Sequence, residues 1–212
     1  MKIFSVKMCF VSKRRQRVFC SLFICPLLVL LCSCSAVSIT QPVGDSAVED
    51  ASAFEGTWQT KEDVVYFKNK GSGKLDCSFV ESNETESELK TVNLVLTKVG
   101  KLNLAFIQEK EGEEWLFGAY RLDEKRQTIS VHEPLVDTFI AAVENKQISG
   151  QISPSEKGER DPLEERSVKL EARDQKLVPF LMRMRYEDGF NPKSEIILKK
   201  LSDQVQLPDL KQ

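Results

Sequence analysis

Hydrophobic and polar positions alternate in several short runs between residues 64 and 131. Within a run every second residue is apolar, which is the period of a β-strand with one buried face. Turn-forming residues separate the runs, so that strands recur about every eight to twelve residues. The runs begin at Val64, Leu75, Val92, Leu102, Trp115 and Ile129. This spacing predicts a mainly β fold, an antiparallel meander that forms a barrel or a sandwich.

The C-terminal half also contains two segments with the period of a helix. Residues 135–146 and 174–185 each place their apolar side chains on one face, and Asp174 is available as an N-cap for the second helix. The remaining strands are predicted at residues 148–152, 168–172 and 196–198. The folded domain is therefore predicted to span residues 54–201, with a short tail at residues 202–212.

Composition and charge exclude several classes of function. The chain has 212 residues, of which 41% are hydrophobic and 29% are charged, the balance of a globular protein. Residues 1–33 hold six of the 30 basic residues and no acidic residue, which leaves 24 bases against 32 acids in the rest of the chain. Because affinity for phosphate comes from clustered Lys and Arg, so acidic a body is not expected to bind nucleic acid.

The first 33 residues have the pattern of a signal peptide. A basic cluster at residues 13–17 precedes an apolar run at residues 18–31. Fourteen helical residues span about 21 Å, which is less than the roughly 30 Å of a bilayer core. This length favours a segment that is removed on export over a permanent membrane span.

Residues 31–34, Leu-Cys-Ser-Cys, resemble the lipobox of bacterial lipoproteins. The resemblance implies that Cys34 becomes the N-terminus and carries a diacylglyceryl thioether and a further acyl chain such as palmitate, which together anchor a protein firmly. Because Ser35 rather than Asp follows the cysteine, it also implies sorting to the outer membrane, facing the periplasm. Residues 34–53 are then expected to form a flexible tether. Ordinary secretion is the alternative, since Cys34-Ser35-Ala36 loosely matches the A-x-A cleavage pattern.

The start of the domain, Phe54-Glu55-Gly56-Thr57-Trp58, resembles lipocalins and their calycin relatives. The matching residues are Gly56 and Trp58. The resemblance implies a small antiparallel barrel in which Trp58 closes one end and packs against an arginine, for which Arg121 and Arg173 are candidates. The alternative is a tryptophan that merely begins a strand, and even a true calycin fold would not fix the function.

No set of residues for catalysis or metal binding is apparent in the sequence. His132 is the one histidine of the chain and is interpreted as a lone surface residue. Cys77 alternates with apolar neighbours and is interpreted as a small buried hydrophobic residue. Residues 71–74, Gly-Ser-Gly-Lys, lack the other positions of a phosphate loop and predict a hairpin turn. We therefore expect a protein that is not an enzyme and has no cofactor or metal.

Two classes of function are favoured over an enzyme. In the first, a membrane-anchored lipoprotein binds a small apolar or lipid-like ligand inside its barrel. In the second, an envelope assembly or inhibitor protein acts through its outer surface, and side chains fill the barrel. Eight strands allow either arrangement. The large residues expected to point inward favour a filled barrel, and they are Phe79, Leu94, Leu104, Phe106 and Phe117. An enclosed apolar cavity above roughly 300 Å³ would favour a ligand.

Overall fold

The structure is a computed structural model, and it describes residues 36–61, 63–82, 87–153 and 166–202. The predicted signal peptide, the predicted lipidation site Cys34 and the tail from residue 203 lie outside these ranges. None of the helices in the described part of the chain has the length and the apolar character needed to span a bilayer.

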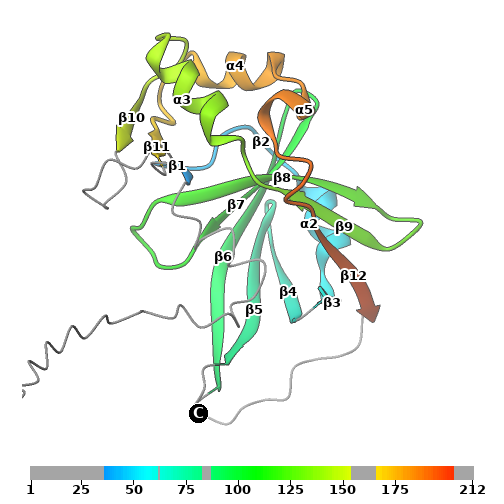
Figure 1. Cartoon of the computed structure of the whole chain (residues 1–212). Coiled ribbons are helices and arrows are strands. Elements are labelled where there is room, and N and C mark those ends of the chain that lie inside the picture. Colours follow the sequence, from blue (N-terminus) through cyan, green and yellow to red (C-terminus); the bar gives the residue numbers. More distant parts are fainter. Residues whose placement is uncertain (1–35, 62, 83–86, 154–165, 203–212) are drawn as a thin grey trace, which may run out of the picture.

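Eight antiparallel strands form a closed barrel, which confirms the predicted fold class (Figure 1). Neighbouring strands follow one another in sequence from β3 to β9; β12 then pairs with both β9 and β3, and pairing of β8 with β9 closes the barrel. The strands are β3 (Gly56–Gln59), β4 (Val64–Gly71), β5 (Lys74–Ser82), β6 (Ser87–Val99), β7 (Leu102–Gln108), β8 (Trp115–Asp123), β9 (Thr128–His132) and β12 (Ile196–Ser202).

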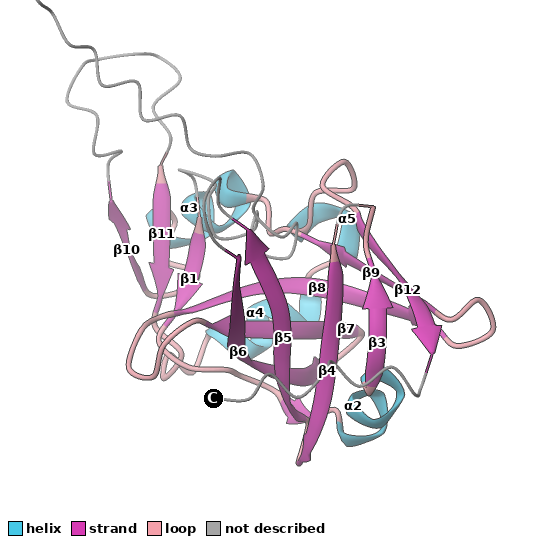
Figure 2. Cartoon of the chain, turned by 90° about the horizontal axis from the view of Figure 1, so that it is seen from below, coloured by secondary structure: helices cyan, strands magenta, loops and turns pink. Residues whose placement is uncertain are grey.

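The described parts of the chain between β9 and β12 form a second layer outside the barrel. They contain α3 (Val136–Glu144), β10 (Gly150–Ser153), β11 (Ser167–Leu170), α4 (Leu177–Arg183) and α5 (Tyr186–Gly189). Strands β10 and β11 do not enter the barrel. Strand β10 pairs with β11, and β11 pairs with β1 (Val37–Ile39), which continues the sheet from the first half of β8 (Figure 2). The helix predicted at residues 174–185 is α4, which begins later, at Leu177, and the separate short helix α5 follows it.

Asp174 acts beside helix α4 rather than as its N-cap. The cap residue is Lys176, which makes no capping side-chain hydrogen bond. The carboxylate of Asp174 instead accepts hydrogen bonds from the backbone N–H groups of Lys176, at 3.0 Å, and Ser149, at 2.6 Å. These two bonds lower the pKa of Asp174 and join the start of α4 to the turn before β10.

Gly118 marks the point where strand β8 changes its partner. The first residues of β8 pair with β1, and the residues from Ala119 onward pair with β9. A Cβ atom at Gly118 would lie 2.9 Å from the carbonyl oxygen of His132, closer than such contacts normally allow. A glycine at this position therefore lets the two branches of the sheet meet.

The prediction of a flexible tether at residues 34–53 is wrong for the part of this segment that the structure describes. This segment contains β1, β2 (Asp45–Ser46) and α2 (Val48–Phe54). Most of its apolar side chains are buried against the barrel and the outer layer, and these are Val37, Ile39, Val43, Ala47, Ala51 and Phe54. These elements are too short to show a clear period, but their burial makes them part of the domain, which begins by residue 36 rather than at residue 54.

Two hydrophobic cores lie on opposite faces of the barrel wall. The inner core fills much of the barrel and includes Phe79 and Leu94, as expected. Leu104, Phe106 and Phe117 were expected to point inward as well, but they belong to the outer core, beneath the layer formed by β1, β11 and the helices. Both faces of β7 are buried, so the alternation of residues does not tell which face is inside. The smaller Ala105 and Ile107 face the interior instead.

Candidate functional site

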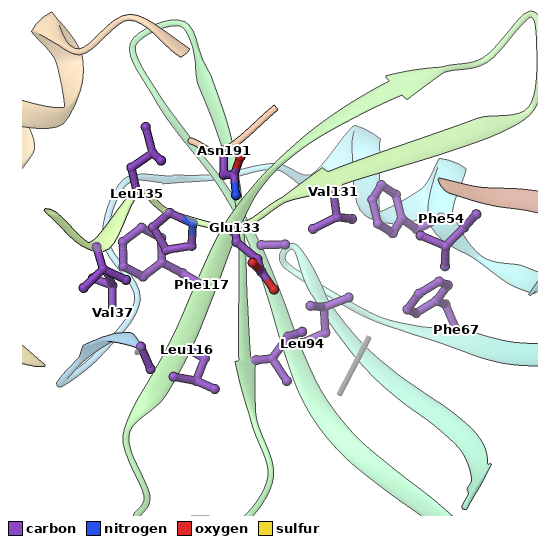
Figure 3. A pocket seen from close by; sticks show the side chains of 17 residues that line it. Val37, Phe54, Phe67, Leu94, Leu116, Phe117, Val131, Glu133, Leu135 and Asn191 are labelled. Carbon is purple, nitrogen blue, oxygen red and sulfur yellow. The ribbon is translucent and has the colours of Figure 1, made fainter. Parts of the chain in front are cut away.

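A cavity of about 250 Å³ occupies the barrel interior and extends to the outer layer (Figure 3). Its buried inner part is apolar and is lined by Phe54, Phe67, Leu94, Ala105, Ile107, Gly118, Val131 and Leu198. Half-buried residues form its mouth, and they include Ala36, Leu116, Glu133, Pro134, Leu135, Val136 and Asn191. The cavity is smaller than the roughly 300 Å³ at which typical ligand pockets begin. It shows nevertheless that side chains do not fill the barrel completely.

Helix α2 closes the end of the barrel opposite the mouth. The ring of Phe54 packs against Phe67 with a centroid distance of 5.6 Å, and edge-on against Tyr120 at 5.2 Å. Because these rings come from α2, β4 and β8, they form an apolar floor that joins distant parts of the chain. The cavity therefore has a closed apolar end and a half-buried mouth.

A polar network fixes helix α2 in this position. The hydroxyl of Tyr120 donates a hydrogen bond of 2.7 Å to Oδ2 of Asp50, and Lys98 Nζ lies 3.0 Å from Oδ1 of the same carboxylate. Burial and the neighbouring Asp50 carboxylate raise the pKa of the Tyr120 hydroxyl, so it stays protonated and acts as a donor. The network links α2 to β6 and β8.

Glu133 brings a carboxylate to the mouth of the cavity. Its backbone is held on both sides, because its N–H donates to Ser194 Oγ at 3.0 Å and its carbonyl oxygen accepts from the N–H of Asn191 at 2.8 Å. The carboxylate itself points among the apolar lining residues (Figure 3). Burial raises the pKa of Glu133 above its ordinary value. Within the described ranges this carboxylate forms neither a hydrogen bond nor an ion pair.

The mouth contains few other polar groups. Among the described residues that line the cavity, Glu133 is the only ionisable one and Asn191 supplies the only other polar side chain.

His132 is buried, with 6% of its surface exposed, so its assignment as a surface histidine is wrong. Its Nδ1 lies 3.2 Å from the carbonyl oxygen of Asn191, and its Nε2 lies 3.7 Å from the carboxylate of Glu195. These contacts help to hold the segment after β9 in place.

Trp58 is 1% exposed and lies next to the closed end of the barrel. Its indole N–H donates a hydrogen bond of 2.6 Å to the carbonyl oxygen of Phe54, the last residue of α2. Between them, Gly56 adopts a φ of +116°, a conformation that favours glycine and turns the chain from α2 into β3. The two residues of the Gly-x-Trp pattern thus join the helix to the barrel.

The cation near the Trp58 ring is a lysine. Lys200 of the last strand places its Nζ 5.7 Å from the ring centroid. The expected arginine partners lie elsewhere, because Arg121 packs over the ring of Tyr186, 3.9 Å from its centroid, and Arg173 is exposed. The prediction that Arg121 or Arg173 packs against Trp58 is therefore wrong.

Other candidate residues from the sequence lie away from the cavity mouth. Cys77 is buried in the inner core. Residues 71–74 form the turn between β4 and β5, as predicted. Across the residues that the structure describes, no cluster of three or more His, Cys, Asp or Glu side chains could hold a metal ion.

Comparisons of this chain with protein-family models, with curated proteins and with solved structures found no match. The cavity and the sequence of the N-terminal segment are therefore the features of the molecule that bear on its function.

Proposed function

We propose that this protein is a membrane-anchored, non-catalytic bacterial lipoprotein whose lipocalin-like barrel binds a small apolar or lipid-like ligand. The observation that supports this proposal is the cavity inside the barrel, with its apolar inner lining and half-buried mouth. Transfer of an apolar molecule from water into such a site is favourable in proportion to the area it buries.

The size of the cavity limits the ligand to a small molecule. An apolar cavity of about 150 Å³ is large enough for benzene. A cavity of about 250 Å³ therefore suits roughly ten non-hydrogen atoms, such as a short alkyl chain or one substituted ring. A long acyl chain would fit only if part of it remained outside the mouth.

The proposed anchor would place the mouth of the cavity next to the membrane. Ala36 lies at the mouth, and Cys34 precedes it by only two residues. Two residues of extended chain reach at most about 7 Å. With acyl chains on Cys34, the cavity would open toward the lipid surface, from which an apolar ligand could enter. We assign this surface to the periplasmic face of the outer membrane because Ser35 follows the cysteine.

Binding to the cavity is tested with octan-1-ol, a linear probe of suitable size. Calorimetric titration of the protein should show saturable binding at one site. In Ala105→Phe the new ring enters the cavity from β7, and binding should be lost while the protein remains folded. Ala141→Phe makes the same change at an exposed position of α3 and should bind as the wild type does. Equal binding by all three proteins, or no binding by the wild type, would contradict the proposal.

The proposed anchor is tested by substitution of its acceptor. The wild-type protein should fractionate with membranes and incorporate labelled palmitate, whereas Cys34→Ala should do neither. Palmitate incorporation into Cys34→Ala would contradict the assignment of Cys34, and a wild-type protein found in the soluble periplasmic fraction would favour ordinary secretion.

The second candidate function, an envelope assembly or inhibitor protein, is favoured by apolar residues on the outside of the barrel. Val64, Val80 and Leu89 are exposed on the neighbouring strands β4, β5 and β6, and Val80 is paired with Leu89. Adjacent exposed apolar side chains are typical of interaction surfaces. Loss of co-purifying envelope proteins in Val80→Asp, with octan-1-ol binding unchanged, would show that this surface carries a separate function.

A further inference from the structure

The carboxylate of Glu133 is an unusual group to find at the mouth of an apolar cavity. Its backbone contacts to Ser194 and Asn191 fix where the side chain starts, and Figure 3 shows the carboxylate among the lining side chains. Leu94, Phe117 and Val131 of the lining are apolar and buried. A charged carboxylate in such surroundings has lost part of its hydration, which is unfavourable unless a cation or hydrogen-bond donors replace it.

Two basic side chains of β8 and β9 make contacts with groups other than Glu133. The ring of the adjacent His132 contacts Asn191 and Glu195. Arg121 packs over Tyr186 and lies 3.9 Å from Glu187. The described lining of the cavity contains no Lys or Arg side chain. A cation supplied by a ligand would therefore meet the carboxylate without displacing an existing ion pair in this part of the protein.

We propose that the ligand is an amphiphilic cation, whose ammonium group pairs with Glu133 while its apolar portion occupies the barrel interior. This inference rests on the proposed function, since it requires that the cavity takes a ligand, and it specifies the chemical class. The ammonium group forms charge-assisted hydrogen bonds with the carboxylate, which are stronger than those between neutral groups. The alkyl portion extends toward Phe54 and Phe67 at the closed end. A neutral or anionic amphiphile gains only the apolar part of this interaction.

The raised pKa of Glu133 agrees with this assignment. Burial is what raises the pKa, so the empty cavity disfavours the charged form of the carboxyl group. A bound ammonium group offsets this effect, and it stays protonated at neutral pH because alkyl amines, like lysine, ordinarily titrate near pH 10. The charged form of the carboxylate is therefore unfavourable in the protein alone and is stabilised by the ammonium group in the complex.

The test compares three probes with the same alkyl chain, namely n-octylamine, octan-1-ol and n-octanoate. Each is titrated calorimetrically at neutral pH into the full chain, purified in a sterol-based detergent whose rigid rings are too bulky for the cavity. The variants are Glu133→Gln, which removes the charge and keeps the shape, and Glu124→Gln, which makes the same change at an exposed turn. Because partition of each probe into detergent is the same for all variants, the ratio of affinities between variants is the quantity measured.

We expect Glu133→Gln to weaken octylamine binding by about tenfold or more, to change octanol binding by less than about threefold, and to strengthen octanoate binding. Glu124→Gln should leave all three affinities unchanged. If octanol binds in the cavity but Glu133→Gln does not weaken octylamine binding, the inference is wrong and the proposed function stands. If no probe binds to the wild type, both are wrong.

Discussion

At the scale of single residues, the structure places the carboxylate of Glu133 among the residues that line the cavity. The sequence places this residue directly after a predicted strand and next to the only histidine, but nothing in that pattern indicates that its carboxylate enters a cavity. Its position results from contacts with Asn191 and Ser194, 58 and 61 residues later in the chain. Such long-range contacts leave no local signal, so the sequence alone did not identify the site.

We predict that Glu133→Gln makes the ligand-free protein more stable than the wild type at neutral pH. The folded-state pKa of Glu133 is raised, so the folded protein holds this proton more tightly than the unfolded chain does. The free energy of unfolding of the wild type therefore falls as pH rises through the range between the unfolded and folded pKa values of Glu133. Below that range Glu133 is protonated in both states, and the stability gained by Glu133→Gln disappears. Thermal unfolding of both proteins between about pH 3 and pH 7 measures it.

The comparison isolates Glu133 because His132, Glu195 and all other titrating groups are present in both proteins. Glu124→Gln at the exposed turn should show no such pH-dependent gain. A Glu133→Gln protein that is less stable than the wild type at pH 7 would mean that the carboxylate has a favourable partner in the folded protein.

Trp58 has a structural effect that can be divided into two parts. We predict that Trp58→Ala lowers the free energy of unfolding by about 3–5 kcal/mol, because it leaves a large void beside Phe54. Trp58→Phe keeps most of the ring but removes the donor to the Phe54 carbonyl, and the loss of that bond should cost about 1–3 kcal/mol. Chemical denaturation measures both. A loss below about 1 kcal/mol in Trp58→Ala would mean that the ring contributes little to packing.

At the scale of elements, the sequence predicted strands well and the connections between them poorly. Strands β4 to β9 were recognisable because period-two runs end at turn residues. Helix α2 was missed because it has only seven residues and no capping side chain. Strands β10 and β11 were recognised as strands, but the attachment of this pair outside the barrel, through β11 and β1, depends on where β8 branches. Alternation also failed to orient β7, since both of its faces are buried.

The part played by β1 and α2 leads to a prediction about truncation. A protein that begins at residue 54 loses the strand that pairs with β8 and β11, and the helix that closes the barrel. We expect it to lose cooperative thermal unfolding and to be cleaved rapidly by protease, because its barrel floor and part of its outer core are exposed. A protein that begins at residue 36 should unfold cooperatively. Equal melting temperatures for the two proteins would contradict the assignment of residues 36–53 to the domain.

The hydrogen bond and the ion pair at Asp50 allow a more specific test of helix α2. Asp50→Asn keeps the shape of the side chain but removes the charge that pairs with Lys98 and accepts from Tyr120. We expect a loss of about 1–3 kcal/mol in the free energy of unfolding, as for a hydrogen bond to a charged group. Glu49→Asn removes an exposed charge from the same helix and should have a much smaller effect. Similar losses in both variants would show that the network does not hold α2.

At the scale of the whole molecule, the barrel, the short N-terminal link and the outer layer suggest a single arrangement for function. The closed end carries α2 and Trp58, while the mouth lies beside Ala36 and therefore within about 7 Å of Cys34. The fold class followed from local patterns, but the existence of the cavity did not. It depends on small interior residues such as Ala105 and Gly118, whose larger neighbours in sequence face the outer core.

The claim that the barrel interior is a ligand site is tested most directly by methyl-resolved NMR of the protein during titration with octan-1-ol. If the ligand binds inside the barrel, we expect saturable chemical-shift changes at Leu94, Ile107, Val131 and Leu198, which line the cavity. Methyl groups of the outer core, such as those of Leu104 and Leu170, should change little. Shifts confined to the outer core or to the exposed Val64, Val80 and Leu89, or no saturable shift at all, would contradict it.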